Sequence, residues 1–212
     1  MRILLIDHVP LHATAVGSQT LALAHGLCAA GHEVRVLTVD VAHQGQEDFP
    51  VRRVVCRRDE ASADLPFDVP CFTPLAYSRQ TFQDLSDDEL AAYREAIRDA
   101  LDEEIAVFDP RMIHCQHIWV GGHLALETGV PYVLTAFADE LAALRDDTRY
   151  CRLAQEAAEN AGRILVESDA LRGEVLEACG GLEDRVLVVG EPYAVEQLVA
   201  IYQQVADERF GA

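Results

Sequence analysis

Short apolar runs alternate with helix-like segments along almost the whole chain, and this alternation is what most constrains the fold. Residues 2–7 read Arg-Ile-Leu-Leu-Ile-Asp, the pattern of a strand that is buried on both faces. Residues 19–30 follow with apolar side chains at helical spacing, Gly31 stands where a helix would stop, and residues 33–39 form a second apolar run. A strand–loop–helix–strand unit of this kind opens a doubly wound parallel sheet.

The same alternation continues to the end of the chain. Further strands are predicted at residues 51–56, 112–115, 131–135, 163–167 and 185–189. Further helices are predicted at residues 86–107, 121–128, 147–161, 169–179 and 193–209. Residues 57–78 contain three prolines and no clear period, so we expect a long loop there. The sequence therefore predicts a single Rossmann-like doubly wound parallel sheet of six to seven strands flanked by helices, with residues 1–192 as one domain.

Charge limits the partners that such a chain can have. The sequence holds 36 acidic residues against 17 basic ones, every basic residue is arginine, and the net charge is -19. Because a surface of this sign repels nucleic acid and anionic membranes, we expect no nucleic-acid binding and no stable membrane insertion. No apolar run approaches the roughly 20 residues of a membrane span, and no signal-like segment precedes the first strand. A cytoplasmic location is expected.

The loop after the first predicted strand offers His12, Gly17 and Ser18 as candidate ligand-binding residues. Ligands of open α/β sheets bind beyond the carboxyl ends of the strands, and this loop lies there. Gly17 and Ser18 would open a helix whose N-terminal amides favour an anion, although they can equally be a helix start without a ligand. With one glycine the loop lacks the G-x-G-x-x-G pattern, so a dinucleotide site is not expected.

A second candidate segment, His-Cys-Gln-His-Ile-Trp, follows a later strand and ends at Trp119. It contains His114 and His117, and a third histidine, His123, follows shortly after. A metal site is not expected, because His114 and His117 would point to opposite faces of an extended strand and no nearby carboxylate completes a ligand set. The six cysteines are far apart and contain no C-x-x-C pair. We predict no metal and no cofactor, with His117 and Trp119 lining a cleft and His114 hydrogen-bonded internally.

Four segments, in this order, resemble the N-terminal, acceptor-side domain of GT-B glycosyltransferases of family 4. They are residues 1–6 with 17–19 and 27–34, residues 113–119 with 121–122, residues 129–135, and residues 161–168 with 171–172 and 185–189. The resemblance covers about residues 1–189. The last helix, within residues 193–212, is similar to the family's C-terminal helix, which packs back onto this domain.

The chain departs from the family pattern after the strand Gly-Val-Pro-Tyr-Val-Leu-Thr. Phe137 and Ala138 stand where the family has a histidine, which lies against the donor sugar, and a glycine. Phenylalanine can neither hydrogen-bond nor exchange a proton. The family's donor-binding domain also does not follow Val189. The resemblance therefore implies a domain that is not catalytic alone, that binds a sugar or glycoside acceptor, and that works with a donor-domain partner chain or as a homo-oligomer.

Two other classes of function stay open at this point. One is a non-catalytic interaction or regulatory module, or a truncated scaffold, on a pseudo-glycosyltransferase fold. The other is a small-molecule enzyme that uses His117, Asp139 or Glu140 as acid or base. The candidate cleft residues under all three hypotheses are His12, Gly17, Ser18, His117, Trp119, Phe137, Asp139 and Glu140.

Overall fold

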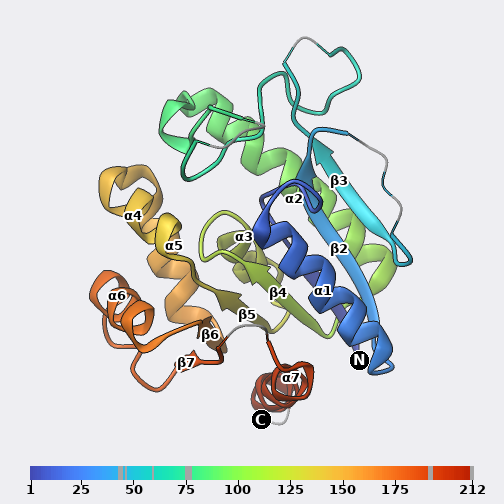
Figure 1. Cartoon of the computed structure of the whole chain (residues 1–212), viewed down its shortest axis with the longest axis vertical. Helices are drawn as coiled ribbons and strands as arrows, with labels where there is room; N and C mark the ends of the chain where they lie inside the picture. The colour runs from blue at the N-terminus through green and yellow to red at the C-terminus, as the bar shows by residue number, and fades with distance from the viewer. Residues whose placement is uncertain (43–44, 46, 59, 75–77, 191–192, 211–212) are drawn as a thin grey trace.

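The computed structural model describes residues 1–42, 45, 47–58, 60–74, 78–190 and 193–210. These residues form one parallel seven-stranded sheet with the order β3-β2-β1-β4-β5-β6-β7 (Figure 1). The strands are β1 (Arg2–Ile6), β2 (Glu33–Asp40), β3 (Val51–Val55), β4 (Met112–Gln116), β5 (Tyr132–Thr135), β6 (Arg163–Val166) and β7 (Val186–Val188). The predicted doubly wound sheet is confirmed, whereas the predicted domain boundary at residue 192 lies outside the described residues.

Helices cover both faces of the sheet. They are α1 (Ala15–Ala29), α2 (Asp87–Phe108), α3 (Gly121–Thr128), α4 (Ala138–Asp146), α5 (Thr148–Asn160), α6 (Asp169–Cys179) and α7 (Val195–Phe210), with a short 3-10 helix, η1 (Phe82–Asp84). Helices α1 and α7 lie on one face, and α2, α3, α5 and α6 lie on the other (Figure 1). Strand β1 serves both layers, because Ile3 and Leu5 face α1 and α7 while Leu4 and Ile6 face the opposite side.

Most helix boundaries follow from capping residues. Helix α2 begins after Ser86, whose hydroxyl accepts from the Glu89 backbone while the Glu89 carboxylate accepts from the Ser86 backbone. Ser168 caps α6, because its hydroxyl accepts the Leu171 backbone N–H. Helix α1 begins earlier than residue 19, because the Thr14 hydroxyl accepts the Gly17 backbone N–H at 2.8 Å. Among the described helices, none combines the length and the apolar character that a bilayer crossing requires.

Helix α4 corrects a prediction. No helix is predicted from the sequence between residues 135 and 147, but Phe137 is the N-cap residue of α4 and Ala138, Asp139 and Glu140 form its first turn. Two acidic residues in that turn suit the positive end of the helix dipole. The candidate residues after β5 are therefore held by a regular helix.

Helix α7 packs beside α1 on the sheet (Figure 1). Leu198 and Tyr202 are fully buried in this layer, and Val205 lies against the start of β6. A Cβ atom at Gly162 would come within 2.3 Å of the Val205 side chain, so this close approach depends on glycine. The apolar side chains of α7 thus face the sheet.

Candidate functional site

A cluster of buried polar side chains lies at the carboxyl edge of the sheet. Asp7 and His8 directly follow β1, Gln116 ends β4, His117 follows it, and Glu140 comes from the first turn of α4. Each of these five residues is at most 2 % exposed. Together with Trp119, which is equally buried and whose backbone N–H binds Glu140, we call them the carboxyl-edge cluster. Such burial is rare for ionisable side chains unless they are paired, so their partners decide what the cluster can do.

His117 and Glu140 form the central pair of this cluster. The His117 Nδ1 atom lies 3.7 Å from the Glu140 Oε2 atom, which is too long for a hydrogen bond and close enough for a charge interaction. The other carboxylate oxygen, Oε1, accepts the backbone N–H groups of Ile118 (2.6 Å) and Trp119 (3.0 Å). Burial alone would lower the pKa of His117, but the carboxylates of Glu140 and Asp7 outweigh it, and the pKa is raised.

Asp7 is the second carboxylate of the cluster. One of its oxygens accepts the backbone N–H groups of His8 (2.7 Å) and Val9 (3.3 Å), and the other accepts the Thr20 hydroxyl at 2.6 Å. Burial raises the pKa of Asp7, while these hydrogen bonds and the nearby His117 act in the opposite direction. Asp7 is thus fixed by α1 and its own loop, with its charge directed at His117.

His8 is a neutral structural member of the cluster. Burial and the neighbouring His117 lower the pKa of His8 to about 3. Its Nε2 atom lies 2.8 Å from the Trp119 carbonyl oxygen and 3.2 Å from the Gly121 backbone nitrogen, and its Nδ1 atom lies 3.1 Å from the Tyr93 hydroxyl. With both nitrogens engaged, His8 positions the segment after β4 and is unsuited to exchange protons with a ligand.

Aromatic rings close the cluster from outside. The His117 ring centroid lies 4.8 Å from that of Phe72 and 4.9 Å from that of Phe137. Trp119 packs against Tyr150 and Phe82, and together with Phe72 these rings line a cavity of about 10 Å³. A space of that size holds about one water molecule. His117 and Trp119 therefore lie in the closed interior in this conformation, rather than on an open cleft, and ligand binding by them stays a prediction.

The segment between β4 and α3 is strained. His117 has a φ of 153° and Val120 a φ of 43°, and a positive φ is unusual for a β-branched residue such as Val120. A Cβ atom at Gly121 would come within 3.0 Å of Ile6, so the glycine allows α3 to approach β1. Strain of this kind persists where the surrounding structure fixes it and is often found at functional sites.

Four of the predicted site residues lie apart from both the carboxyl-edge cluster and the aromatic rings that close it. His12 is exposed and lies 2.9 Å from Glu47, and the Ser18 hydroxyl donates to the Thr14 carbonyl. A Cβ atom at Gly17 would come within 2.4 Å of the Pro10 carbonyl oxygen, so packing explains this glycine without a ligand. Asp139 is exposed on the first turn of α4. The structure brings together the other four candidates, which are His117, Trp119, Phe137 and Glu140.

The prediction for His114 is confirmed, and three functional candidates were missed. His114 shares hydrogen bonds with the hydroxyls of Tyr202 (2.6 Å) and Thr135 (2.8 Å), and burial lowers its pKa to about 3. The missed residues are Asp7, His8 and Gln116. Asp7 and His8 directly follow the first apolar strand, which was the available signal, because polar residues at a strand's carboxyl end meet those of its neighbours.

The cluster contains buried hydrogen-bond donors and acceptors that have no partner among the described residues. Both ring nitrogens of His117, both amide atoms of Gln116, the Trp119 indole nitrogen and the Glu140 Oε2 atom are buried without a hydrogen-bond partner among the described residues. Buried polar atoms are normally paired, so this set marks a place where a polar ligand would be stabilised. Within the described part of the chain, no group of three or more His, Cys, Asp or Glu side chains could hold a metal ion.

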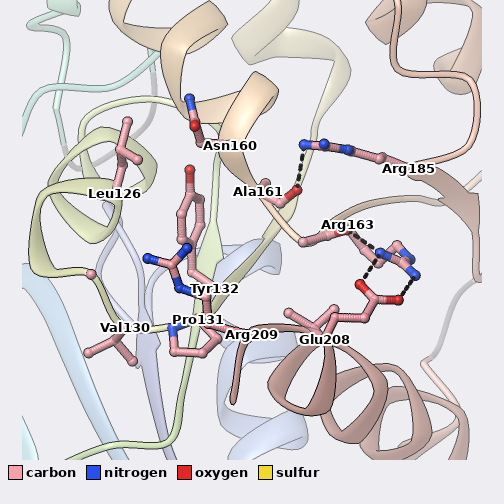
Figure 2. A pocket seen from close by; sticks show the side chains of 13 residues that line it. Leu126, Val130, Pro131, Tyr132, Asn160, Ala161, Arg163, Arg185, Glu208 and Arg209 are labelled. Carbon is pink, nitrogen blue, oxygen red and sulfur yellow. Dashed lines mark hydrogen bonds and ion pairs between the residues drawn. The ribbon is translucent and has the colours of Figure 1, made fainter. Parts of the chain in front are cut away.

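A separate pocket of about 280 Å³ lies at the opposite, amino edge of the sheet (Figure 2). Tyr132 and Arg163 line it from the first residues of β5 and β6, and α7 closes one side. Ligands of open parallel sheets bind beyond the carboxyl ends of the strands. We therefore place the candidate site of the fold at the carboxyl-edge cluster, although the more open pocket is the one at the amino edge.

Comparisons with solved structures show where this fold recurs. The chain is similar to sucrose-phosphate synthase from Thermosynechococcus elongatus, with 15% identity and a TM-score of 0.62 over 90% of this chain and 48% of that one. A shorter chain of the same synthase, labelled 27_220_406_426, has 18% identity and a TM-score of 0.60 over 96% of this chain and 98% of that one. The UDP-GlcNAc 2-epimerase from Neisseria meningitidis, bound to UDP-GlcNAc, has 12% identity and a TM-score of 0.55 over 100% of this chain and 54% of that one.

This chain thus spans about half the length of the first synthase chain and of the epimerase. At these identities the likeness shows the fold alone, and a synthase and an epimerase share it. Curated proteins give no significant match to the sequence. Residues 14–191 match the family model described as a glycosyl transferase 4-like domain, which is most of the chain. The chain therefore belongs to the glycosyl transferase 4-like domain family, and its fold is that of a GT-B glycosyltransferase-like domain.

Proposed function

We propose that this chain is the acceptor-side domain of a family 4 glycosyltransferase and that it does not transfer sugar by itself. The observation that carries the proposal is the position of Phe137, whose ring packs on His117 above the carboxyl-edge cluster. The family resemblance puts a histidine against the donor sugar at this position. A phenyl ring there leaves the acceptor side of the fold in place and removes the polar contact to the donor.

The charges of the cluster also support a role in binding the acceptor rather than the nucleotide-sugar donor. Transfer from a nucleotide sugar needs positioned cations or dipoles for the departing diphosphate. Here Asp7 and Glu140 place two buried carboxylates beside His117, which disfavours a diphosphate at this edge. Under the proposal, the donor and its cations come from a second domain on a partner chain.

A sugar or glycoside acceptor suits the polar atoms left without partners. A hydroxyl group both donates and accepts a hydrogen bond, and the cluster offers both kinds of atom through Gln116, His117 and the Trp119 indole. Phe72 and Phe137 close the approach to His117, so an acceptor would have to displace one of these rings. In the assembled enzyme, the neutral form of His117 would then accept the proton that the acceptor hydroxyl loses, and the neighbouring carboxylates that raise its pKa would favour this protonation.

The test is calorimetric titration with UDP, UDP-glucose, UDP-GlcNAc and a panel of monosaccharides, inositol and their glycosides. We expect no heat of binding from the three nucleotides and a measurable affinity for at least one acceptor. Trp119 is the one tryptophan of the sequence and lies in the cluster, so acceptor binding should also shift its emission. Tight binding of UDP to the wild type would contradict the proposal.

The matched variants are Phe137→His and Phe108→His. The first restores the imidazole of the family pattern beside His117 and should change acceptor affinity or nucleotide binding. Phe108 ends α2 and contacts Arg35, far from the cluster in the fold, so its variant should behave as the wild type. Equal behaviour of both variants would show that position 137 does not belong to the site.

The second candidate function is a non-catalytic interaction module. The observation that favours it is the closed state of the cluster, because Glu140 is 0 % exposed and His117 is 1 % exposed. Under this alternative, no sugar changes the Trp119 emission, and sedimentation equilibrium shows a defined oligomer. A monomer that binds a sugar would exclude it.

A further inference from the structure

The pocket at the amino edge of the sheet has a charge opposite to that of the whole protein. It is lined by residues from α3, β5, the α5–β6 turn and α7, and three arginines and one glutamate are among them, giving three positive charges against one negative. The protein as a whole carries a net charge of -19. The chain has fewer than half as many arginines as acidic residues, so three arginines on one concave surface are unexpected. We call this surface the arginine pocket; its charged residues are Arg163, Arg185, Glu208 and Arg209.

One of the three arginines is neutralised within the pocket. Arg163 makes a two-pronged ion pair with Glu208, with Nη1 3.1 Å from Oε2 and Nη2 2.7 Å from Oε1. In Figure 2 the Arg163 guanidinium turns toward Glu208 at the rim of the pocket. The single carboxylate of the pocket is therefore already engaged by Arg163. Glu208 also interacts electrostatically with Arg185, so the pocket keeps an excess of two positive charges.

The other two guanidinium groups keep their charge. Among the described residues, the hydrogen-bond partners of the Arg185 side chain are the backbone carbonyls of Glu159 and Ala161, which orient the side chain without cancelling its charge. Figure 2 shows the bond to Ala161. Arg209 makes no hydrogen bond or ion pair with the described residues. Arg185 and Arg209 thus present forked donors to the same pocket from two different elements.

The frame of the pocket is rigid, which distinguishes it from a loose group of surface arginines. The Tyr132 hydroxyl donates to the Ala157 carbonyl at 2.6 Å and fixes the wall between β5 and α5. Gly162 lets Val205 approach, so the last turn of α7 is held against the start of β6. The volume of about 280 Å³ is at the lower end of ligand pockets, which suits a small molecule.

We propose that the arginine pocket binds a small phosphate monoester. A planar guanidinium group binds two oxygens of a tetrahedral phosphate through paired N–H donors, and the excess of two positive charges in the pocket matches the two negative charges of a phosphate monoester. The pocket lies at the opposite edge of the sheet from the carboxyl-edge cluster, so this site does not depend on the proposed glycosyltransferase role.

The test is calorimetric titration of the protein at low ionic strength with glycerol 3-phosphate, inorganic phosphate, citrate and uncharged glycerol. We expect the two phosphates to bind, glycerol not to bind, and citrate to bind more weakly than either phosphate. The ester binding more tightly than inorganic phosphate would identify an ester as the ligand, and equal binding would identify the free ion; both support a phosphate site. An affinity for glycerol equal to that for the two phosphates, or tighter binding of citrate than of the phosphates, would overturn the proposed phosphate site.

Three variants locate the site. Arg185→Gln and Arg209→Gln should each weaken phosphate binding about tenfold, since a hydrogen bond to a charged group is lost. Arg152→Gln is the matched control, because Arg152 is an exposed arginine outside the pocket that pairs with Glu156. Unchanged melting temperatures would show that the variants fold. The same loss in Arg152→Gln as in the pocket variants, or no loss in any of them, would overturn the proposal.

Discussion

The two edges of the sheet hold charged side chains in opposite ways. At the carboxyl edge, His117 and Glu140 are buried, separated by 3.7 Å, and each keeps polar atoms without a partner among the described residues. At the amino edge, Arg163 and Glu208 make a closer, two-pronged pair, but Glu208 is half exposed to solvent. The shorter of the two ion pairs is therefore the one at the amino edge, where water screens the charges.

Burial, rather than the distance between the charged atoms, therefore decides how much an ion pair affects the stability of the protein. A pair in water contributes little, because solvent stabilises each partner separately. A buried pair is different, because removing one partner leaves the other charge without compensation. We therefore expect the carboxyl edge to control stability and its pH dependence, and the amino edge to be available for ligands at little energetic cost.

The largest effect is expected from Glu140→Ala. The change removes the partner of the buried His117 and the acceptor of the Ile118 and Trp119 N–H groups, so the free energy of unfolding should fall by about 3–5 kcal/mol. Urea unfolding measures this loss. The control is Glu174→Ala, which removes an exposed ion pair with Arg145 and should change stability by about 0.5 kcal/mol or less. Equal losses in the two variants would erase the contrast between buried and exposed pairs.

An intermediate effect is expected in the pH dependence of stability. The pKa of His114 falls from 6.5 to about 3 on folding, so the unfolded chain binds a proton there below pH 6.5 while the native protein does not. Stability should therefore fall as the pH drops from 6.5 toward 3, by up to about 1.4 kcal/mol per pH unit for this residue. His8 adds a similar contribution over the same window. His117, with its raised pKa, acts in the other direction: its contribution is fully present below pH 6.5 and is lost as the pH rises through its raised value.

The variant that isolates this effect is His114→Gln, measured by urea unfolding at several pH values between 7 and 4.5. Its stability should depend on pH less steeply than that of the wild type, by about 1.4 kcal/mol per pH unit. His12→Gln serves as the control, since that ring is 62% exposed. An unchanged slope in His114→Gln would show that His114 is not held neutral by its burial.

The smallest effect is expected at the amino edge. Glu208→Gln removes the exposed ion pair with Arg163, and thermal unfolding should show a loss of about 1 kcal/mol or less. The same variant frees the Arg163 guanidinium, so it should strengthen phosphate binding in the arginine pocket. A loss of stability as large as that of Glu140→Ala would mean that exposure does not separate the two edges.

Much of the fold was predictable because its signals are local. The apolar runs of β1, β2 and β4 and the caps at Ser86 and Ser168 need no knowledge of distant contacts. Helix α4 was missed because its first turn follows directly after β5 and Phe137 supplies no capping side chain. Its helical form depends on packing of Leu141 and Leu144 in the core, which only the folded chain provides.

The candidate site was predictable only in part. His117, Phe137 and Glu140 were found because they follow strands, and they do converge. Ligand binding by the polar loop at His12 stays a prediction, although the early start of α1 and the packing around Gly17 account for this loop without a ligand. The role of Asp7 depends on a hydrogen bond from Thr20 and on the charge of His117, both set by tertiary structure. The arginine pocket joins segments far apart in sequence, so no local motif could reveal it.

The docking of α7 has a consequence for how the protein is made. Leu198 and Tyr202 cover the same apolar layer as Ile3, Met112 and Val133, and they come later in the chain than the strands of that layer. Until α7 emerges from the ribosome, that part of the sheet face has no cover. Since exposed apolar surface favours aggregation, the nascent chain is vulnerable between the synthesis of β6 and the completion of α7. The covering of this sheet face thus waits for α7.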